Sequence, residues 1–376
     1  MSHLRRRVAM IGWAALALAP RDVVAGPWQT GIELGVEGDS NVSRVETAPD
    51  GPAPVAAGLF RALFELARRG TVGDHLRFRG QVRLGARGVL GAEVESENIV
   101  TGAAELAVER DGPAGTTVLA RASHYDALAL QAGPERRDFA TTGVDVGLRL
   151  PADDEREAEI AVGLRSLTYR RDAAFDWSGP MLAIELRDQV WRCHDDRTID
   201  LSARYQVERR AYTGLAFTRV ACPGGAAGVC VRPTEEHRAD LRHTAEAELL
   251  YSGDQVLSAR YRLTVNDSSS FGSSLYRHRL DLAATIGLPA QVFATATLTG
   301  QLDRFPEPYL AHIDDLDQPV DSIDDENRSG VAVRLARSLS PSWQVEARGA
   351  LFADLFPPDG RGFHRQVVYL GLTWDH

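Results

Sequence analysis

The chain has 376 residues, of which 44% are hydrophobic and 25% are charged, and its formal net charge is -10. This acidic balance argues against a general nucleic-acid-binding protein, which normally carries a basic surface. A mean hydropathy of -0.21 excludes a bundle of membrane helices, but it is compatible with a membrane β-barrel, in which only every second strand residue faces lipid.

Residues 1–25 have the features of a secretory signal peptide. Arginines at positions 5–7 are followed by an apolar run at 8–19, which is too short to span a bilayer. Ala25 fits the small-residue position before a cleavage site, so we expect residues 26–376 to form the mature protein as one domain. The later sequence has no continuous apolar run of the roughly 18 residues that a membrane helix needs.

Beyond residue 28, apolar and polar residues alternate with a period of two. In the segment 74–88 one face carries Leu76, Phe78, Val82, Leu84 and Ala86. The other face carries Arg77, Arg79, Gln81, Arg83 and Arg87. Successive side chains point to opposite faces of a β-strand, so this pattern predicts a strand with one apolar and one charged face.

About sixteen segments show this alternation, within a range of 14–18. We expect them near 30–44, 58–70, 74–88, 98–110, 115–128, 138–151, 156–170, 176–192, 197–212, 238–252, 255–267, 275–288, 290–304, 328–338, 343–356 and 363–375. The second segment also has helical spacing, but the tight turn that follows it favours a strand.

Short and long connections alternate along the chain. Short turns such as 152–156 and 252–254 are rich in Gly, Asp and Ser, whereas 46–57, 214–237 and 305–327 are long. Short turns at one end and long loops at the other are typical of outer-membrane barrels. The sequence therefore predicts an all-β protein, a transmembrane up-and-down antiparallel β-barrel in the bacterial outer membrane.

Aromatic residues cluster near the predicted strand ends, as expected for girdles at the two membrane interfaces. At the periplasmic end we expect Trp28, Trp191, Tyr251, Trp343 and Trp374. At the outer end we expect Tyr125, Tyr169, Trp177, Tyr212, Tyr276, Phe305 and Phe356.

Cys222 and Cys230 flank a Gly-rich stretch of an exported chain, which predicts a disulfide that closes a small loop. The alternative is a pair of free thiols. Cys193 is left outside this pair.

The segment from Gly31 to Arg44 reads Gly-Ile-Glu-Leu-Gly-Val-Glu-Gly-Asp-Ser-Asn-Val-Ser-Arg. It resembles the opening strand of the barrel domains of exopolysaccharide exporters and surface-lipoprotein assembly modifiers. Those barrels usually have Tyr before the Asp, where this chain has Gly38. The resemblance implies a stand-alone barrel that works with separate periplasmic or envelope protein partners.

The charged face of the strands gives the candidate site. We expect the barrel interior to be lined by Arg77, Arg79, Arg83, Arg87, Glu105, Glu109, Arg204, Arg260, Arg262, Arg279 and Arg348. One interpretation is a structural ion-pair network, and the other is a polar path for a hydrophilic solute; both can hold together. The long loops 305–327 and 214–237 could act as plug, lid or docking hairpin.

No catalytic residue, cofactor or metal site is predicted. Gly38-Asp39-Ser40 resembles the nucleophile block of GDS-type esterases, but no later Asp-x-x-His supplies a base, and no His-Glu-x-x-His zinc motif occurs. We expect a non-enzymatic channel or export conduit for a hydrophilic substrate, for which a secreted polysaccharide is a candidate. The alternatives are a structural barrel of a surface or motility complex with a plugged lumen, and a general diffusion porin. The expected partners are outer-membrane lipid and envelope proteins, and not nucleic acid.

Overall fold

The structure is a computed structural model of the whole chain. It describes residues 23–42, 53–91, 97–130, 138–153, 155–170, 172–193, 197–222, 229–307, 329–354, 362 and 364–376. Most of the predicted signal peptide, and most of the predicted 305–327 loop, lie outside these residues.

The described chain is almost entirely β-strand. The strands are β1 (Val23–Ala25), β2 (Gln29–Asp39), β3 (Ala57–Val72), β4 (Leu76–Leu90), β5 (Ile99–Asp111), β6 (Thr117–Ala129), β7 (Phe139–Pro151), β8 (Arg156–Tyr169), β9 (Trp177–Cys193), β10 (Arg197–Val220), β11 (Cys230–Ser252), β12 (Gln255–Ser268), β13 (Leu275–Leu288), β14 (Val292–Arg304), β15 (Ser329–Ser340), β16 (Trp343–Ala353) and β17 (His364–Asp375). Two 3-10 turns, η2 (Pro113–Gly115) and η3 (Ala173–Phe175), join strands. No helix among the described residues is long and apolar enough to cross a membrane.

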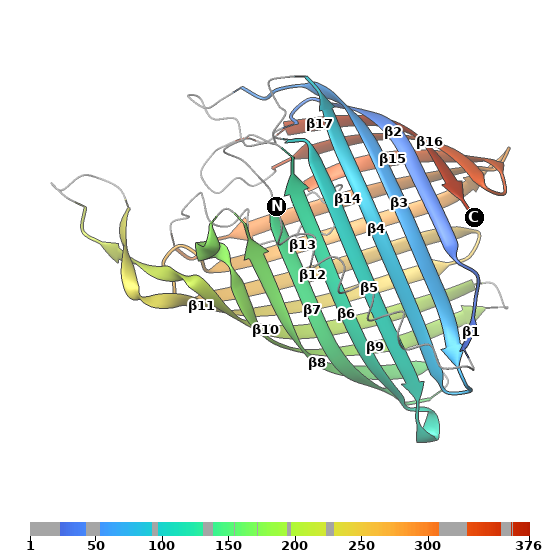
Figure 1. The fold of residues 1–376 in the computed structure, drawn as a ribbon, viewed down its shortest axis with the longest axis horizontal. Helices are drawn as coiled ribbons and strands as arrows, with labels where there is room; N and C mark the ends of the chain where they lie inside the picture. Colours follow the sequence, from blue (N-terminus) through green and yellow to red (C-terminus); the bar gives the residue numbers. More distant parts are fainter. Residues whose placement is uncertain are drawn as a thin grey trace.

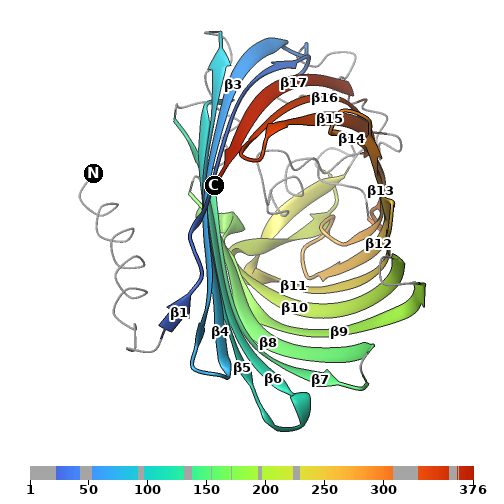
Figure 2. The same ribbon diagram turned by 90° about the vertical axis from the view of Figure 1, so that its right-hand side faces the viewer.

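Strands β2 to β17 form a closed antiparallel barrel. Each strand pairs with the next along the chain, and β17 pairs with β2 from Val367↔Asp39 to Asp375↔Gly31. Figures 1 and 2 show the barrel from the side and after a turn of 90°. The predicted fold class and the sixteen strands are confirmed, and the segment with helical spacing is strand β3.

Turn chemistry explains the short connections at one end of the barrel. The β3–β4 turn has Gly73 at φ +60, a left-handed conformation that glycine adopts without steric cost. The β5–β6 turn has Gly115 at φ +75. The longer connections leave the opposite end of the barrel, which is the external end if the short turns face the periplasm.

The prediction of a loop at 214–237 is wrong for most of its length. Strands β10 and β11 continue to Val220 and from Cys230, so they have 24 and 23 residues and form a hairpin that outreaches the neighbouring strands. The sequence in this region has no regular alternation of apolar and polar residues, and register shifts interrupt the pairing between Ala211 and Phe217.

The barrel closes around a tyrosine that is packed onto glycines. Tyr369 on β17 is 1% exposed, and a Cβ atom on Gly35 or Gly371 would lie within 2.4 Å of its ring or hydroxyl. The Tyr369 hydroxyl donates a hydrogen bond to Glu33 Oε1 at 2.5 Å. The glycines thus leave the space that lets the ring lie against the inner wall where the first and last strands meet.

Candidate functional site

The outer face of the barrel is apolar around its circumference. On β8, Val162 and Leu164 are 57% and 60% exposed, and the next strand β9 presents Leu182, Ile184 and Leu186 in the same way. A water-soluble protein would bury such a surface. A closed barrel satisfies all backbone groups between its strands, which a lipid environment demands. The chain is an outer-membrane β-barrel.

The lipid-facing surface can be tested with two neighbouring residues of β14. Leu298 points outward beside Leu282 and Val331, whereas Thr297 points inward beside Ala283 and Ala332. We expect Leu298→Arg to lower the free energy of unfolding by about 2–4 kcal/mol, because an arginine would be placed near the middle of the bilayer. The control Thr297→Arg should cost less than about 1 kcal/mol, since its side chain reaches the interior. Urea unfolding in lipid vesicles measures both, and equal costs would contradict this assignment of the faces.

Comparison with solved structures finds barrels of low similarity. The high-pH structure of Pseudomonas putida OprB matches over 97% of this chain and 97% of that chain, with 8% identity and a TM-score of 0.49. Pseudomonas aeruginosa OccK11 (OpdR) matches over 93% and 96%, with 8% identity and a TM-score of 0.45. A loop L8 deletion mutant of OmpT, an outer membrane protein of Vibrio cholerae, matches over 94% and 100%, with 11% identity and a TM-score of 0.42. No protein-family model and no curated protein matches the chain. The functional proposal therefore rests on the geometry of this barrel.

Strands β4 and β5 place six of the predicted lumen residues on the inner wall. Arg83 pairs with Glu65 at 2.9 Å, and Arg77 bonds Glu109 at 3.3 Å and Asp111 at 2.7 Å. Arg79 lies between Arg69 and Ala107 in the strand pairing and forms no ion pair among the described residues. Glu105 is likewise exposed and unpaired in this part of the chain.

The opposite wall carries four more of the predicted residues, each close to a carboxylate group. Arg260 bonds Glu248 at 2.7 Å, and Arg262 bonds Glu246 at 2.6 Å, both between β11 and β12. Arg204 on β10 lies 3.7 Å from Glu185 on β9. Arg279 bonds Asp281 two residues further along β13, at 3.0 Å. Guanidinium and carboxylate groups thus alternate around the wall and largely neutralise one another.

Arg348 has a different role from the other predicted lumen residues. Its guanidinium lies 5.2 Å from the centre of the Tyr369 ring, and the guanidinium of Arg61 lies 5.0 Å from the same centre. A cation near the face of an aromatic ring is attracted by its quadrupole. Arg348 therefore lies beside the closing seam of the barrel, the line along which β17 pairs with β2.

At the external end of this seam lies a buried charge cluster, of which only Arg87 was predicted from the sequence. Asp39 accepts hydrogen bonds from Arg365 at 2.8 Å and Arg87 at 2.9 Å, and Arg87 also reaches Glu37 at 3.4 Å. All four side chains are less than 10% exposed. Arg87 was predicted as a lumen residue, but it is 2% exposed and serves this cluster. Arg365 could have been found from its place in the alternation of the last strand.

The motif Asp39-Ser40-Asn41 also belongs to the seam. Asp39 Oδ1 accepts a hydrogen bond from the backbone N–H of Asn41 at 2.9 Å. Ser40 Oγ accepts one from the backbone N–H of Gln366 at 2.8 Å, and the Asn41 amide donates to the carbonyl of His364 at 3.3 Å. The motif therefore joins the end of the first barrel strand to the start of the last.

The prediction of an outer aromatic girdle is wrong for four residues. Tyr169, Trp177 and Tyr212 belong to a buried cluster on the inner wall of β6–β10, and Tyr125 packs against it. The strand alternation places these rings on the same face as inward-pointing charged residues. Tyr125, for example, lies four residues after Arg121 on the same strand, and so on the same face. Tyr276, in contrast, is exposed on the outer face.

Arginines cover this inner aromatic cluster. The guanidinium of Arg210 lies 4.2 Å from the centre of the Trp177 ring, and that of Arg238 lies 4.3 Å from the centre of Tyr212. Arg238 is held in turn by Asp240, with nitrogen–oxygen distances of 2.6 and 3.0 Å. The rings are consequently packed into the wall and are not available to a solute.

Two cavities open on the inner wall near the short-turn end. One, of about 620 Å³, is lined by residues that include Glu157, Arg187, Asp200 and Glu248. The other, of about 680 Å³, lies across the closing seam and is lined by residues that include Glu33, Glu65, Thr373 and Asp375. Most of the residues that line these two cavities are polar or charged.

Strand β14 contributes an uncharged polar stretch to the interior. Thr295, Thr297, Thr299 and Gln301 follow one another on the inward face. Thr299 donates to Asp281 at 2.7 Å, and Thr295 shares a hydrogen bond with Thr285 at 3.0 Å. The interior therefore offers hydroxyl and amide groups as well as paired charges. Within the described residues, no group of three or more His, Cys, Asp or Glu side chains is placed to hold a metal ion.

Proposed function

We propose that the protein is a channel for hydrophilic solutes across the outer membrane. The observation that carries this proposal is the inner wall itself, where arginine, glutamate, aspartate and threonine side chains recur on strands all around the barrel, as in the pairs Arg83–Glu65, Arg121–Asp145 and Arg260–Glu248. A sixteen-strand barrel is wide enough to leave an aqueous lumen. Charged side chains that pair with a neighbour on the wall, such as Arg262 with Glu246, lie along the wall and do not extend across the lumen, so we expect water to fill the lumen.

The paired charges favour a channel with weak contacts to its solute. Fixed charges that neutralise one another attract ions of either sign only weakly beyond the wall, because the field of a close ion pair falls off rapidly. The β14 hydroxyl groups can exchange hydrogen bonds with sugar-like or other polyhydroxy solutes. This wall is compatible with the general diffusion of small solutes and equally with a more specific function, the export of a secreted polysaccharide.

Single-channel recording of the mature protein in a planar bilayer tests the proposal. We expect steady steps of current whose conductance rises with salt concentration, because the ions cross a water-filled lumen. A soluble polysaccharide added to the periplasmic side should reduce the current if the polymer enters, whereas a diffusion porin for small solutes would leave the current unchanged. Protein left unfolded in detergent is the control. Correctly folded barrels that carry no current would contradict the channel and would favour a structural barrel.

A further inference from the structure

The hairpin of β10 and β11 extends beyond the external rim of the barrel. Its pairing continues through Leu215↔His237, Phe217↔Pro233 and Val220↔Cys230, whereas the adjacent strands β9 and β12 stop at Trp177 and Ser268. Figure 1 shows it standing clear of the other strands, and Figure 2, seen from the opposite end of the barrel, shows it at the far end, within the outline of the barrel and not outside the wall. The hairpin therefore overlies the mouth.

The bend toward the barrel axis has a local cause. Register shifts interrupt the β10–β11 pairing between Ala211 and Leu215 and again between Leu215 and Phe217. Irregularities of this kind bend a strand and increase its twist. At the same place Gly214 lies so close to η3 that a Cβ atom would stand 2.4 Å from the carbonyl oxygen of Ala174. Glycine thus permits the approach that turns the hairpin.

Two neighbouring connections hold the base of the hairpin in this position. The backbone N–H of Thr213 donates to the carbonyl of Asp176 at 2.9 Å, beside η3. On the other side, the Phe217 N–H donates to Ser270 Oγ at 3.0 Å, and the Phe271 N–H donates to the Phe217 carbonyl at 2.9 Å. The guanidinium of Arg219 lies 6.0 Å from the centre of the Phe271 ring.

The turn 268–274, which carries Ser270 and Phe271, is itself anchored. Ser268 Oγ donates to the buried Asp240 at 2.6 Å, and the Gly272 N–H donates to Glu307 Oε2 at 2.5 Å. Ser270 and Ser273 are 1% exposed. The hairpin base therefore rests on a buried hydrogen-bonded support and not on solvent-exposed contacts alone.

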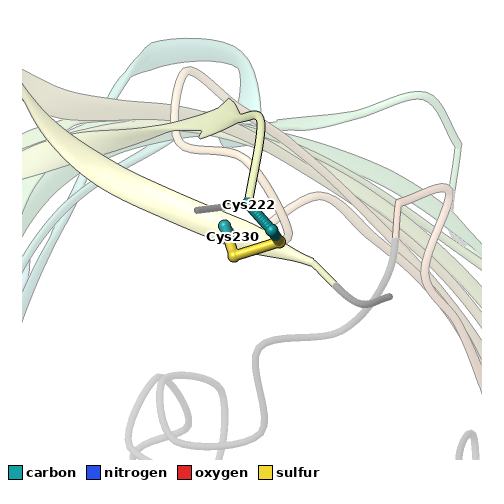
Figure 3. The surroundings of a disulfide bond; sticks show 2 residues. All are labelled: Cys222 and Cys230. Carbon is teal, nitrogen blue, oxygen red and sulfur yellow. A yellow bond between two sulfur atoms is a disulfide. The ribbon is translucent and has the colours of Figure 1, made fainter. Parts of the chain in front are cut away.

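The disulfide Cys222–Cys230 fixes the far end of the paired region (Figure 3). An isolated two-stranded hairpin is only marginally stable in water, so a strand pair that leaves its sheet needs other support. Here the base contacts supply it at one end and the cross-link at the other. The cross-link joins two cysteines that are eight positions apart in the chain.

We propose that this braced β10–β11 hairpin narrows the external opening and sets the upper size of the solutes that pass. The inference rests on the proposed channel function and identifies the part of the barrel that determines solute size. A constriction of this kind differs from a mobile gate, since contacts with Ser270 and Phe271 hold the base of the hairpin and the disulfide holds its two strands together. The barrel is consequently expected to exclude solutes more strictly from the external side than from the periplasmic side.

Polymer exclusion in planar bilayers tests this proposal. Polyethylene glycols of increasing mass lower the conductance only while they enter the lumen, so the smallest excluded polymer reports the size of each opening. In one variant residues 216–236 are replaced by an Asn-Gly turn, which suits a tight hairpin. We expect its external exclusion limit to shift to a larger polymer and its conductance to rise. The periplasmic limit, measured on the same channels, is the control and should stay unchanged.

A second variant separates the role of the hairpin from a general loss of folding. The double substitution Cys222→Ser and Cys230→Ser keeps the chain length and should increase the fluctuations of the open-channel current, as should dithiothreitol on the unmodified protein. Heat-dependent mobility in SDS gels reports whether each barrel has folded. The inference alone would be overturned if the trimmed variant forms conducting channels whose external exclusion limit is unchanged. If the trimmed variant does not fold, it would be overturned by channels whose current fluctuations are unchanged after loss of the disulfide. Folded barrels without conductance would reject the channel and this inference together.

Discussion

Replacing Tyr369 with alanine is expected to lower the free energy of unfolding by about 3–5 kcal/mol, the range found when a large buried aromatic side chain is removed. The ring is 1% exposed and lies against Gly35 and Gly371, with guanidinium groups near its centre at 5.0 and 5.2 Å. Its removal leaves a cavity where the first and last strands meet, and Glu33 loses its hydroxyl donor. Urea unfolding in lipid vesicles measures the effect.

The glycine beneath the ring provides a double-mutant test of the same packing. Gly35→Ala should cost about 1–3 kcal/mol in the unmodified protein, because its Cβ would overlap the ring and the neighbours hold the ring in place. In the Tyr369→Ala background the same change should cost much less, since the obstacle is gone. Tyr276→Ala, at an exposed position on the outer face, is the control. Additive costs of the two substitutions would contradict the proposed packing.

Replacing Asp39 with alanine is the second change with a large expected effect. The Asp39 carboxylate is 3% exposed and faces two buried guanidinium groups, those of Arg87 and Arg365. Removing one partner from a buried ionic cluster leaves uncompensated charge and typically costs about 3–5 kcal/mol. We expect Asp39→Ala to lose that much stability and Asp39→Asn to recover little, because asparagine keeps the shape of the side chain but not its charge.

A matched control for Asp39 lies on the same inner face. Glu105 is exposed and has no ion-pair partner among the described residues, so Glu105→Ala should change the free energy of unfolding by less than about 0.5 kcal/mol. The two variants remove the same charge, and they differ in burial and pairing. If both cost the same, the cluster at the seam does not stabilise the closed barrel, and the structural role given to the Asp39-Ser40-Asn41 motif is wrong.

Most of the strands can be predicted from the sequence because successive side chains of a strand point to opposite faces. The expected segment 275–288 coincides with β13, and the expected segment 156–170 differs from β8 by one residue. In a membrane barrel the apolar face of each strand meets lipid and the charged face meets the polar interior. The same argument fails at 214–237, where the hairpin leaves the membrane and no longer needs an apolar face.

The distinction between an inner wall and a buried cluster was not visible in the sequence. Arg83 and Arg87 lie four residues apart on one face of β4, yet Arg83 is exposed to the lumen and Arg87 is buried. The difference comes from Asp39 and Arg365, which are 326 residues apart in the chain and meet only because the barrel closes. The inward direction of Tyr125 and Trp177 could have been predicted, because they lie an even number of residues from Arg121 and Glu185 on the same strands. Their location near the strand ends suggested an interfacial girdle instead.

Local alternation and turn residues are enough to predict about sixteen antiparallel strands with an apolar outer face and a charged inner face. They do not predict which charges neutralise one another, which aromatic rings face inward, or where the longest hairpin points. Those properties depend on register between strands, on closure of β17 against β2, and on contacts between connections that are distant in the chain. No local pattern encodes them, since each arises from side chains that meet only in the closed barrel.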